Sequence, residues 1–421
     1  MEHEHPYRSP AGRRGARHIR RLAHAPGVAA AALLVAVGVS AAFFVSFGAA
    51  AVRRPSPVSL AWSNQAGIQH LHFRTAPISV AIAARRAKIQ RALTQMVEEG
   101  APGAVVAFRD GSRTLRLAGG FADTARKTPM SVDDRFRIGS VTKSFVAVVV
   151  LQLVGEGKLS LDDTVERWLP GLVPNGDKIT VRQLLDHTSG LYNYTDDKRL
   201  LAPYLRGNLT YAWSPKRLVG LATDHSTRFA PGTSWSYSNT NYIVLGLIVQ
   251  AVTGNTLGDE LRRRIIDRLG LRQTSFDRQA WIRGPHAHGY TIVGGPNARD
   301  VSVVSPTWAW AAGAMVSTAD DLLRFYRALL RGRLLKPDLL RQMEATVDTG
   351  SGIVRDGLGL FRTRLRCSLA WGHNGDFAGY LTNVFNSRDG RRQLVVLVNE
   401  DSLPALADQS LQQLLFRGYC G

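Results

Sequence analysis

The sequence predicts an α/β (α+β) fold in which an antiparallel sheet is built from both ends of the chain. Three observations lead to this prediction. Strand-like patterns occur near both ends, a helical pattern lies outside each pair of strands, and mostly helical patterns fill the middle. The terminal helices would flank one face of the sheet, and the middle segment would form an inserted helical lobe on the other. An active site is then expected between the two lobes.

The first folded elements are predicted to be a helix and a hairpin. Residues 83–99 have a helical pattern that Gly100 closes. Two strand-like runs follow at 103–109 and 113–118, and they are joined by the turn Asp110-Gly111. The chain therefore enters the sheet within its first folded segment.

The end of the chain mirrors its start. Strand-like runs at 378–385 and 393–399 surround Asp389-Gly390, and residues 403–416 have the pattern of a closing helix. Between the two ends, helical patterns alternate with loops rich in Gly and Pro. The predicted inserted helices are 141–154, 181–186, 240–252, 257–268 and 318–330.

The first 80 residues are predicted to lie outside the folded domain, which spans 81–421. Residues 1–24 are rich in arginine, and 25–52 are uncharged. The uncharged stretch exceeds both the roughly 7 to 15 residues of a signal-peptide core and the roughly 20 residues of a spanning helix. It is interpreted either as a retained membrane anchor or as a secretory signal cleaved near Ala51. Both interpretations predict an extracytoplasmic domain, with 53–80 as its linker.

The net charge of +20 is distributed unevenly. Residues 1–54 hold eight Arg and two acidic residues, or +6, which leaves +14 on the rest of the chain. This excess is diffuse, and no zinc-finger spacing, basic helix or RNA-binding motif accompanies it, so we expect no nucleic-acid partner. An anionic cell wall or membrane surface suits an exported basic domain better. The sequence does not indicate which oligomeric state the protein adopts.

Cys367 and Cys420 are the two cysteines of the chain. In an exported protein they are able to form one disulfide that fixes the last segment. Two free thiols are the alternative, because sequence spacing does not establish that the two side chains meet.

Ser140 and Lys143 form the first candidate catalytic pair. Ser140 falls at a predicted helix start, and Lys143 lies one turn later on the same face. A lysine can accept the proton of a serine hydroxyl where burial or nearby positive groups lower the lysine pKa. The helix N-terminus would also favour an oxyanion. The alternative is an N-cap serine followed by an exposed lysine.

Two later segments add polar candidates. Tyr237 and Asn239 lie in a Gly/Ser-rich loop before the helix predicted at 240–252. A tyrosine at such a place can relay a proton, and an asparagine can hold the lysine and a substrate amide. His373, flanked by glycines at a predicted strand, would hydrogen-bond the tyrosine and tune its proton. Alternatively, Tyr237 is an aromatic residue that only packs in the fold, beside an asparagine that caps the following helix. His373 would then be a hydrogen-bonded histidine at the end of a strand.

Three motifs in this order resemble those of the serine β-lactamase and D-alanyl-D-alanine carboxypeptidase superfamily. The likeness is strongest to secreted actinobacterial D-alanyl-D-alanine carboxypeptidases and includes the AmpC-type β-lactamases. It runs from about residue 84 to 418, and residues 184–191, 229–232 and 311–315 support it. The resemblance implies a β-lactamase/transpeptidase-like fold with 81–421 as a serine hydrolase domain. The motifs are Ser140-Val141-Thr142-Lys143, Tyr237-Ser238-Asn239 and His373-Asn374-Gly375.

The resemblance also implies roles for these residues. Ser140 would attack the substrate, Lys143 and Tyr237 would share the base and acid roles, and His373 would close the site. The backbone N–H groups of Ser140 and Asp376 would form the oxyanion hole, and Asn239 would orient the lysine. No metal and no organic cofactor are implied. The implied substrate-binding and oxyanion positions are Asn239, Asn374, Gly375 and Asp376.

One position departs from the carboxypeptidase pattern. Asn374 stands where these enzymes place a threonine that helps bind the terminal carboxylate of the substrate, and Asp376 adds a negative charge close by. The expected function is an extracytoplasmic serine hydrolase that acts through an acyl-enzyme on D-alanyl peptides of peptidoglycan. The alternatives are an esterase, a D-amino-acid amide hydrolase, a β-lactamase, or a non-catalytic cell-wall or penicillin-binding protein. The corresponding partner is a small molecule or peptide: a D-alanyl peptide, an ester or a β-lactam.

Overall fold

A computed structural model describes residues 78–291 and 298–421 of the chain. The predicted basic segment 1–24, the anchor or signal 25–52 and linker residues 53–77 lie outside the described residues, so those assignments stay predictions. Within the two described ranges, no helix is both long enough and apolar enough to cross a membrane.

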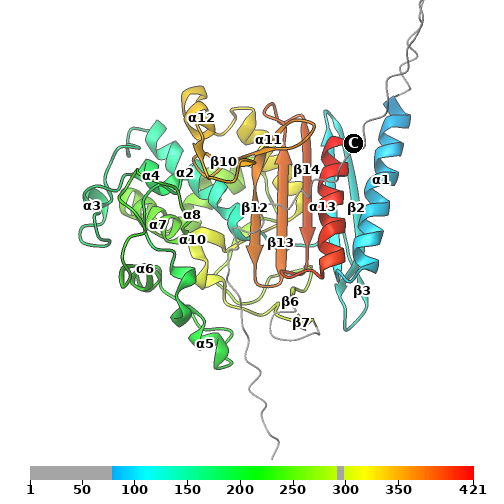
Figure 1. Ribbon diagram of the computed structural model, residues 1–421, viewed down its shortest axis with the longest axis horizontal. Helices are drawn as coiled ribbons and strands as arrows, with labels where there is room; N and C mark the ends of the chain where they lie inside the picture. The colour runs from blue at the N-terminus through cyan, green and yellow to red at the C-terminus, as the bar shows by residue number, and fades with distance from the viewer. Residues whose placement is uncertain (1–77, 292–297) are drawn as a thin grey trace, which may run out of the picture. The chain divides into compact units, whose positions relative to one another are not determined.

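A nine-stranded antiparallel sheet combines strands from both ends of the chain (Figure 1), which confirms the predicted architecture. The ends meet where β1 (Gly103–Asp110) pairs with β14 (Arg392–Val398). The predicted strand at 378–385 starts later, because Gly379 turns the chain at φ +83. The sheet order is β3-β2-β1-β14-β13-β12-β11-β10-β9, with β2 Arg113–Asp123, β3 Thr128–Pro129, β9 Val347–Asp348, β10 Val354–Asp356, β11 Phe361–Arg364, β12 Leu369–Phe377 and β13 Tyr380–Asn386.

Both faces of this sheet are covered. Val106 of β1 packs beneath α1 (Ile78–Glu98) and α13 (Ala405–Cys420), whereas Val105 faces the helical lobe (Figure 1). Two apolar faces explain why the strand sequences read as continuous apolar runs. Helix α13 extends past the predicted 403–416, and its last residue, Cys420, forms a disulfide with Cys367. The disulfide, not the pair of free thiols, is therefore the arrangement in the structure.

The helical lobe is built around α2 (Thr142–Gly155). Phe145 and the residues up to Leu151 are fully buried, as expected for a helix that is apolar on all sides. Two small sheets support the lobe: β4 (Phe136–Arg137), β8 (Met315–Ser317) and β5 (Ser275–Phe276), and β6 (Tyr290–Thr291) with β7 (Arg299–Asp300). The other helices are α3 Val165–Trp168, α4 Val181–Leu185, α5 Ala202–Leu205, α6 Pro215–Thr223, α7 Asn239–Thr253, α8 Leu257–Leu261, α9 Asp267–Leu269, α10 Trp310–Gly313, α11 Ala319–Leu330 and α12 Pro337–Glu344.

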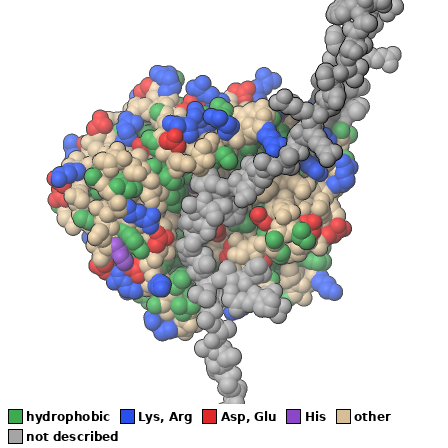
Figure 2. All heavy atoms as spheres, viewed as in Figure 1, with side chains coloured by type: hydrophobic (Ala, Val, Ile, Leu, Met, Phe, Trp, Pro, Cys, Tyr) green, Lys and Arg blue, Asp and Glu red, His purple; other side chains and the backbone are tan. Residues whose placement is uncertain are grey.

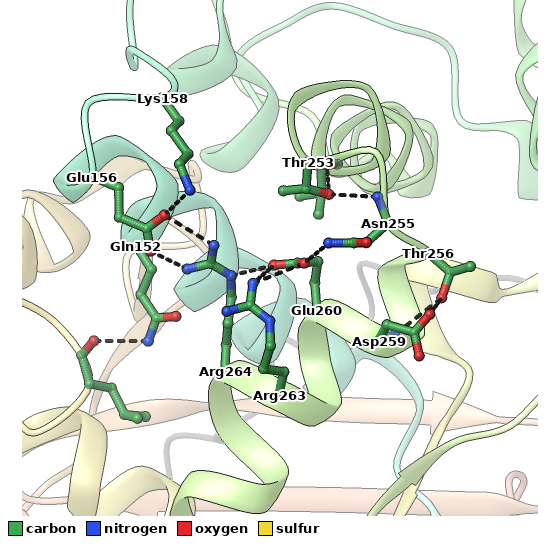
Figure 3. Close-up of polar contacts among 12 residues, drawn as sticks. Gln152, Glu156, Lys158, Thr253, Asn255, Thr256, Asp259, Glu260, Arg263 and Arg264 are labelled. Carbon is green, nitrogen blue, oxygen red and sulfur yellow. Dashed lines mark hydrogen bonds and ion pairs between the residues drawn. The ribbon is translucent and has the colours of Figure 1, made fainter.

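The single helix predicted at 257–268 is interrupted by a π-helical turn at Arg262–Ile266. Arg263 and Arg264 both bond the fully buried carboxylate of Glu260 from this turn (Figure 3), and Arg263 does so at 2.8 Å. Arg264 also pairs with Glu156, the residue that follows α2. The network therefore joins the interrupted helix to the helix that begins at the candidate serine.

We expect Arg264→Ala to destabilise the domain by about 3 kcal/mol, because it leaves a buried glutamate with reduced compensation. The matched control is Arg262→Ala in the same turn, which removes an exposed pair with Asp259 and should cost at most about 1 kcal/mol. Denaturant unfolding of both variants measures this difference. Equal losses of stability in the two variants would show that the buried network contributes no more than a surface ion pair.

Candidate active site

Ser140 lies where the chain enters the central helix. The Ile138 N–H donates to the Met315 carbonyl oxygen at 3.0 Å. Gly139 then adopts φ +48, a conformation that favours glycine, in the short turn η2 (Gly139–Val141). This turn presents Ser140, half-buried, at the N-terminus of α2 and at the wall of a pocket.

The amine of Lys143 contacts the hydroxyl of Ser140. Its Nζ donates to Ser140 Oγ at 2.9 Å, to Asn239 Oδ1 at 2.8 Å and to the Ala312 carbonyl oxygen at 2.7 Å. Burial lowers the pKa of Lys143 well below its usual value, and an electrostatic interaction with Asp356 opposes that shift. A lysine in this state is suited to accept a proton from a hydroxyl at hydrogen-bond distance.

Tyr237 lies against the same amine. Lys143 Nζ is 4.9 Å from the centroid of the Tyr237 ring. Burial raises the pKa of Tyr237, and a side-chain hydrogen bond with Ser140 opposes the rise. The tyrosine hydroxyl therefore keeps its proton beside the serine, where a leaving group would need one.

His187 was not among the predicted site residues, yet it supports the tyrosine. Its ring centroid lies 4.3 Å from that of Tyr237, and its Nδ1 accepts the Ser238 N–H at 3.1 Å. Burial lowers the pKa of His187 well below its usual value, which suits a neutral ring that accepts a hydrogen bond. Its backbone has φ 61, which is rare for a residue other than glycine. The stretch 184–191 had supported the family resemblance, but nothing in it indicated this contact.

Asn239 connects the lysine to a second layer of polar groups. Its backbone N–H donates to Asn193 Oδ1 at 2.9 Å, and its side-chain Nδ2 lies 3.3 Å from Thr195 Oγ1. With both of these groups bound, the remaining amide oxygen faces Lys143. The asparagine is therefore placed to orient the lysine.

Two glycines bring β12 close to the start of α2. A β-carbon at Gly139 would lie 2.7 Å from the Asp376 nitrogen, and one at Gly375 would lie 3.2 Å from the Ser140 nitrogen. Side chains at these two positions would push the strand away from the helix. The glycines therefore make the backbone N–H groups of Ser140 and Asp376 close neighbours.

His373 has a different partner from the expected one. Instead of bonding Tyr237, its Nδ1 bonds the carbonyl oxygen of the neighbouring Asn374, and its ring stacks on Phe361 at 4.2 Å. Burial, with Lys143 nearby, lowers the pKa of His373 to about 3. The neutral imidazole therefore lines the pocket as an aromatic wall beside Phe361.

Asn374 and Asp376 are the exposed polar residues of the β12 edge, and both line the pocket. The Asp376 carboxyl touches pocket solvent but is surrounded by protein. Partial loss of solvation within the pocket, together with the charge of Asp401, raises the pKa of Asp376 to about 8. Among the described residues, no cationic side chain pairs with it.

The site opens into a pocket of about 380 Å³. The described lining includes a single Lys or Arg, Arg228, and this arginine pairs with Asp196. A larger cavity of about 810 Å³ lies beside α8, but it contains none of the predicted site residues and no nucleophile–base pair. Within 78–291 and 298–421, no three His, Cys or acidic side chains are arranged to hold a metal.

Comparison with known proteins gives one family match that includes every predicted site residue. Residues 89–416 match the model of the family described as Beta-lactamase. The chain is 32% identical over 285 residues to penicillin-binding protein 4 of Amycolatopsis lactamdurans, and the aligned region covers 66% of this chain and 71% of that protein. It is 29% identical over 307 residues to the D-aminopeptidase of Brucella anthropi, covering 71% of this chain and 56% of that protein.

Solved structures show the same fold. The crystal structure of a D-stereospecific amidohydrolase from a Streptomyces species is 39% identical, with a TM-score of 0.74 over 80% of this chain and 99% of that one. The D-amino acid amidase of Ochrobactrum anthropi SV3, solved in complex with D-phenylalanine, is 28% identical. Its TM-score is 0.71 over 79% of this chain and 98% of that one.

Proposed function

Because this chain belongs to the beta-lactamase family of serine hydrolases, we propose that it hydrolyses amide bonds of D-amino-acid derivatives through an acyl-enzyme on Ser140. Neutral Lys143 takes the hydroxyl proton as Ser140 Oγ attacks the substrate carbonyl. The N–H groups of Ser140 and Asp376 hold the oxyanion. Tyr237 donates a proton to the leaving amine, and water then hydrolyses the ester and restores the serine.

The polarity of the pocket is the observation that favours this substrate class. A free cation would favour a substrate with a terminal carboxylate, and the one arginine of the described lining is already paired with Asp196. Asp376 instead offers a carboxyl that pairs with no cation among the described residues, and an ammonium group of the substrate would pair with it and favour its ionised form. The amidohydrolase, amidase and D-aminopeptidase among the similar proteins support D-amino-acid amides or peptides with a free amine.

A D-alanyl-D-alanine carboxypeptidase activity is the second candidate. It is supported by the similarity to penicillin-binding protein 4 and by the Ser140, Lys143 and Tyr237 arrangement, which the two activities would share. The two candidates differ in the group that the pocket must bind beyond the scissile bond. One requires recognition of an ammonium group, and the other requires recognition of a carboxylate.

A matched substrate panel tests the proposal. D-phenylalanine amide should be hydrolysed with a kcat/KM at least roughly 10-fold above its L-enantiomer, its N-acetyl derivative and a D-Ala-D-Ala peptide with a free carboxylate. One tenfold step corresponds to about 1.4 kcal/mol, within the range of a single charge-assisted hydrogen bond. Asp376→Asn should reduce the preference for the free amine over the N-acetyl form. Faster hydrolysis of the carboxylate-bearing peptide would identify the carboxypeptidase instead, and nitrocefin or a short-chain ester as the best substrate would identify a β-lactamase or an esterase.

We also propose that the domain acts outside the cytoplasmic membrane, with 25–52 as its anchor or signal. The basic excess beyond residue 54 suits an anionic wall or membrane surface. Lys and Arg side chains occur on several sides of the face drawn in Figure 2, in agreement with a diffuse electrostatic attraction.

A further inference from the structure

Asp356 is a buried acid beside the site that exchanges no proton in the proposed chemistry, although it interacts electrostatically with Lys143. It ends β10, is 1% exposed, and its Oδ1 has no hydrogen-bond partner. In the sheet register it lies opposite Phe361 of β11, the residue that stacks on His373. A buried carboxyl with one unsatisfied oxygen is costly, so a functional reason for it is expected.

The other oxygen of Asp356 holds Trp235. The indole Nε1–H donates to Asp356 Oδ2 at 3.0 Å. Trp235 lines the pocket and stands two residues before Tyr237 in the loop 231–238, which we call the tyrosine loop. A contact at Trp235 therefore acts on the backbone that presents the Tyr237 hydroxyl to Ser140.

The remaining bonds of the tyrosine loop go to the helical lobe. Ser236 N–H donates to the His187 carbonyl oxygen at 3.1 Å, and Ser238 N–H donates to the His187 ring. Among the described residues, the bond from Trp235 to Asp356 is the only hydrogen bond that ties this loop to a strand of the nine-stranded sheet. The site needs such a tie, because Ser140 and Tyr237 come from the lobe while the second oxyanion group, Asp376, comes from the sheet.

We propose that Asp356 is a positioning residue that fixes Tyr237 relative to the sheet by accepting the Trp235 N–H. The inference rests on the proposed function, in which Tyr237 transfers a proton during acyl transfer at Ser140. Burial raises the pKa of Asp356 well above its ordinary value, so a neutral amide of the same shape is a suitable replacement.

The test compares Asp356→Asn, which keeps an acceptor oxygen, with Asp356→Leu and Trp235→Phe, which each remove the bond. We expect Asp356→Leu and Trp235→Phe to lower kcat by roughly 10- to 100-fold with KM changed by less than about 3-fold, since small displacements of a reacting group have effects of this size. The double variant should be no slower than the single ones. Asp356→Asn should stay within about 3-fold of the wild type.

The matched control is Trp168→Phe, which removes another indole bond to an aspartate, the 3.1 Å bond to Asp163 outside the pocket. It should leave kcat unchanged, and thermal unfolding shows whether each variant is folded. A loss in Asp356→Asn as large as in Asp356→Leu, an effect confined to KM, or additive losses in the double variant would overturn the proposal. Covalent labelling of Ser140 by a fluorophosphonate probe separates this outcome from a failure of the proposed function, in which the wild type itself would not react at Ser140.

Discussion

Ser140→Ala abolishes turnover of every substrate in the panel, because no other nucleophile among the described pocket residues lies beside a buried amine. Its hydroxyl is the one that Lys143 Nζ reaches at 2.9 Å. Loss of the nucleophile in serine hydrolases lowers kcat on the order of 10⁶-fold. Steady-state hydrolysis of D-phenylalanine amide, measured through the release of ammonia, quantifies this loss.

The control for this prediction is Ser144→Ala, one turn further along α2. The Ser144 hydroxyl is buried and bonds Tyr326 and the Gly359 carbonyl oxygen rather than the pocket groups. This variant loses some stability but retains turnover. Residual turnover in Ser140→Ala at more than about a thousandth of the wild-type rate would place the nucleophile elsewhere.

Lys143→Ala slows acylation by roughly 10²- to 10⁴-fold, the contribution of a general base. The pKa of Lys143 lies well below its usual value because the side chain is fully buried. At a pH above this lowered pKa the amine is neutral and acts as a base. At a pH below it the amine is protonated and cannot accept the serine proton. Acylation by the wild type should accordingly fall as the pH decreases through this pKa, and this limb should disappear in Lys143→Ala.

Stopped-flow acylation rates across a pH series test both statements. Lys158→Ala, which removes an exposed lysine paired with Glu156, is the control and should keep the wild-type profile. Because Lys143→Ala also opens a cavity beside Asn239, its unfolding midpoint is measured as well. A folded Lys143→Ala protein that acylates at nearly the wild-type rate would assign the proton to another base.

Much of the fold follows from local patterns in the sequence. The helix that opens the domain, the hairpin at Asp110-Gly111 and the two late strands were predicted because turn residues and apolar periods coincide there. The π-helical interruption near Glu260 could not be predicted in this way. At this turn Arg264 pairs with both Glu260 and Glu156, and Glu156 lies more than a hundred positions earlier in the chain.

The candidate site was predicted to a similar extent. The structure brings Ser140, Lys143, Tyr237 and Asn239 together, as predicted. Each of them lies at the start of a helix or just before one, and sequence motifs at such positions are informative. The predicted partner of His373 is wrong, because the bond of its ring to the Asn374 carbonyl depends on a side-chain conformation that no sequence motif encodes.

Two supporting residues near the site, His187 and Asp356, were not predicted at all. His187 acts through a left-handed backbone conformation, and Asp356 acts through a hydrogen bond to Trp235 across 121 positions. No local sequence pattern indicates that a histidine adopts a left-handed backbone conformation. No local pattern indicates a contact between residues that lie so far apart in the chain. Such supporting contacts are visible only once the chain is folded.

Ser140 is proposed to carry the acyl group, and intact-protein mass spectrometry of the domain with a slowly hydrolysed β-lactam detects such an acyl-enzyme. We expect a mass increase of one β-lactam per wild-type chain, located by peptide mapping on Ser140 and absent from Ser140→Ala. An adduct on any other residue, or one that persists unchanged in Ser140→Ala, would show that Ser140 is not the nucleophile.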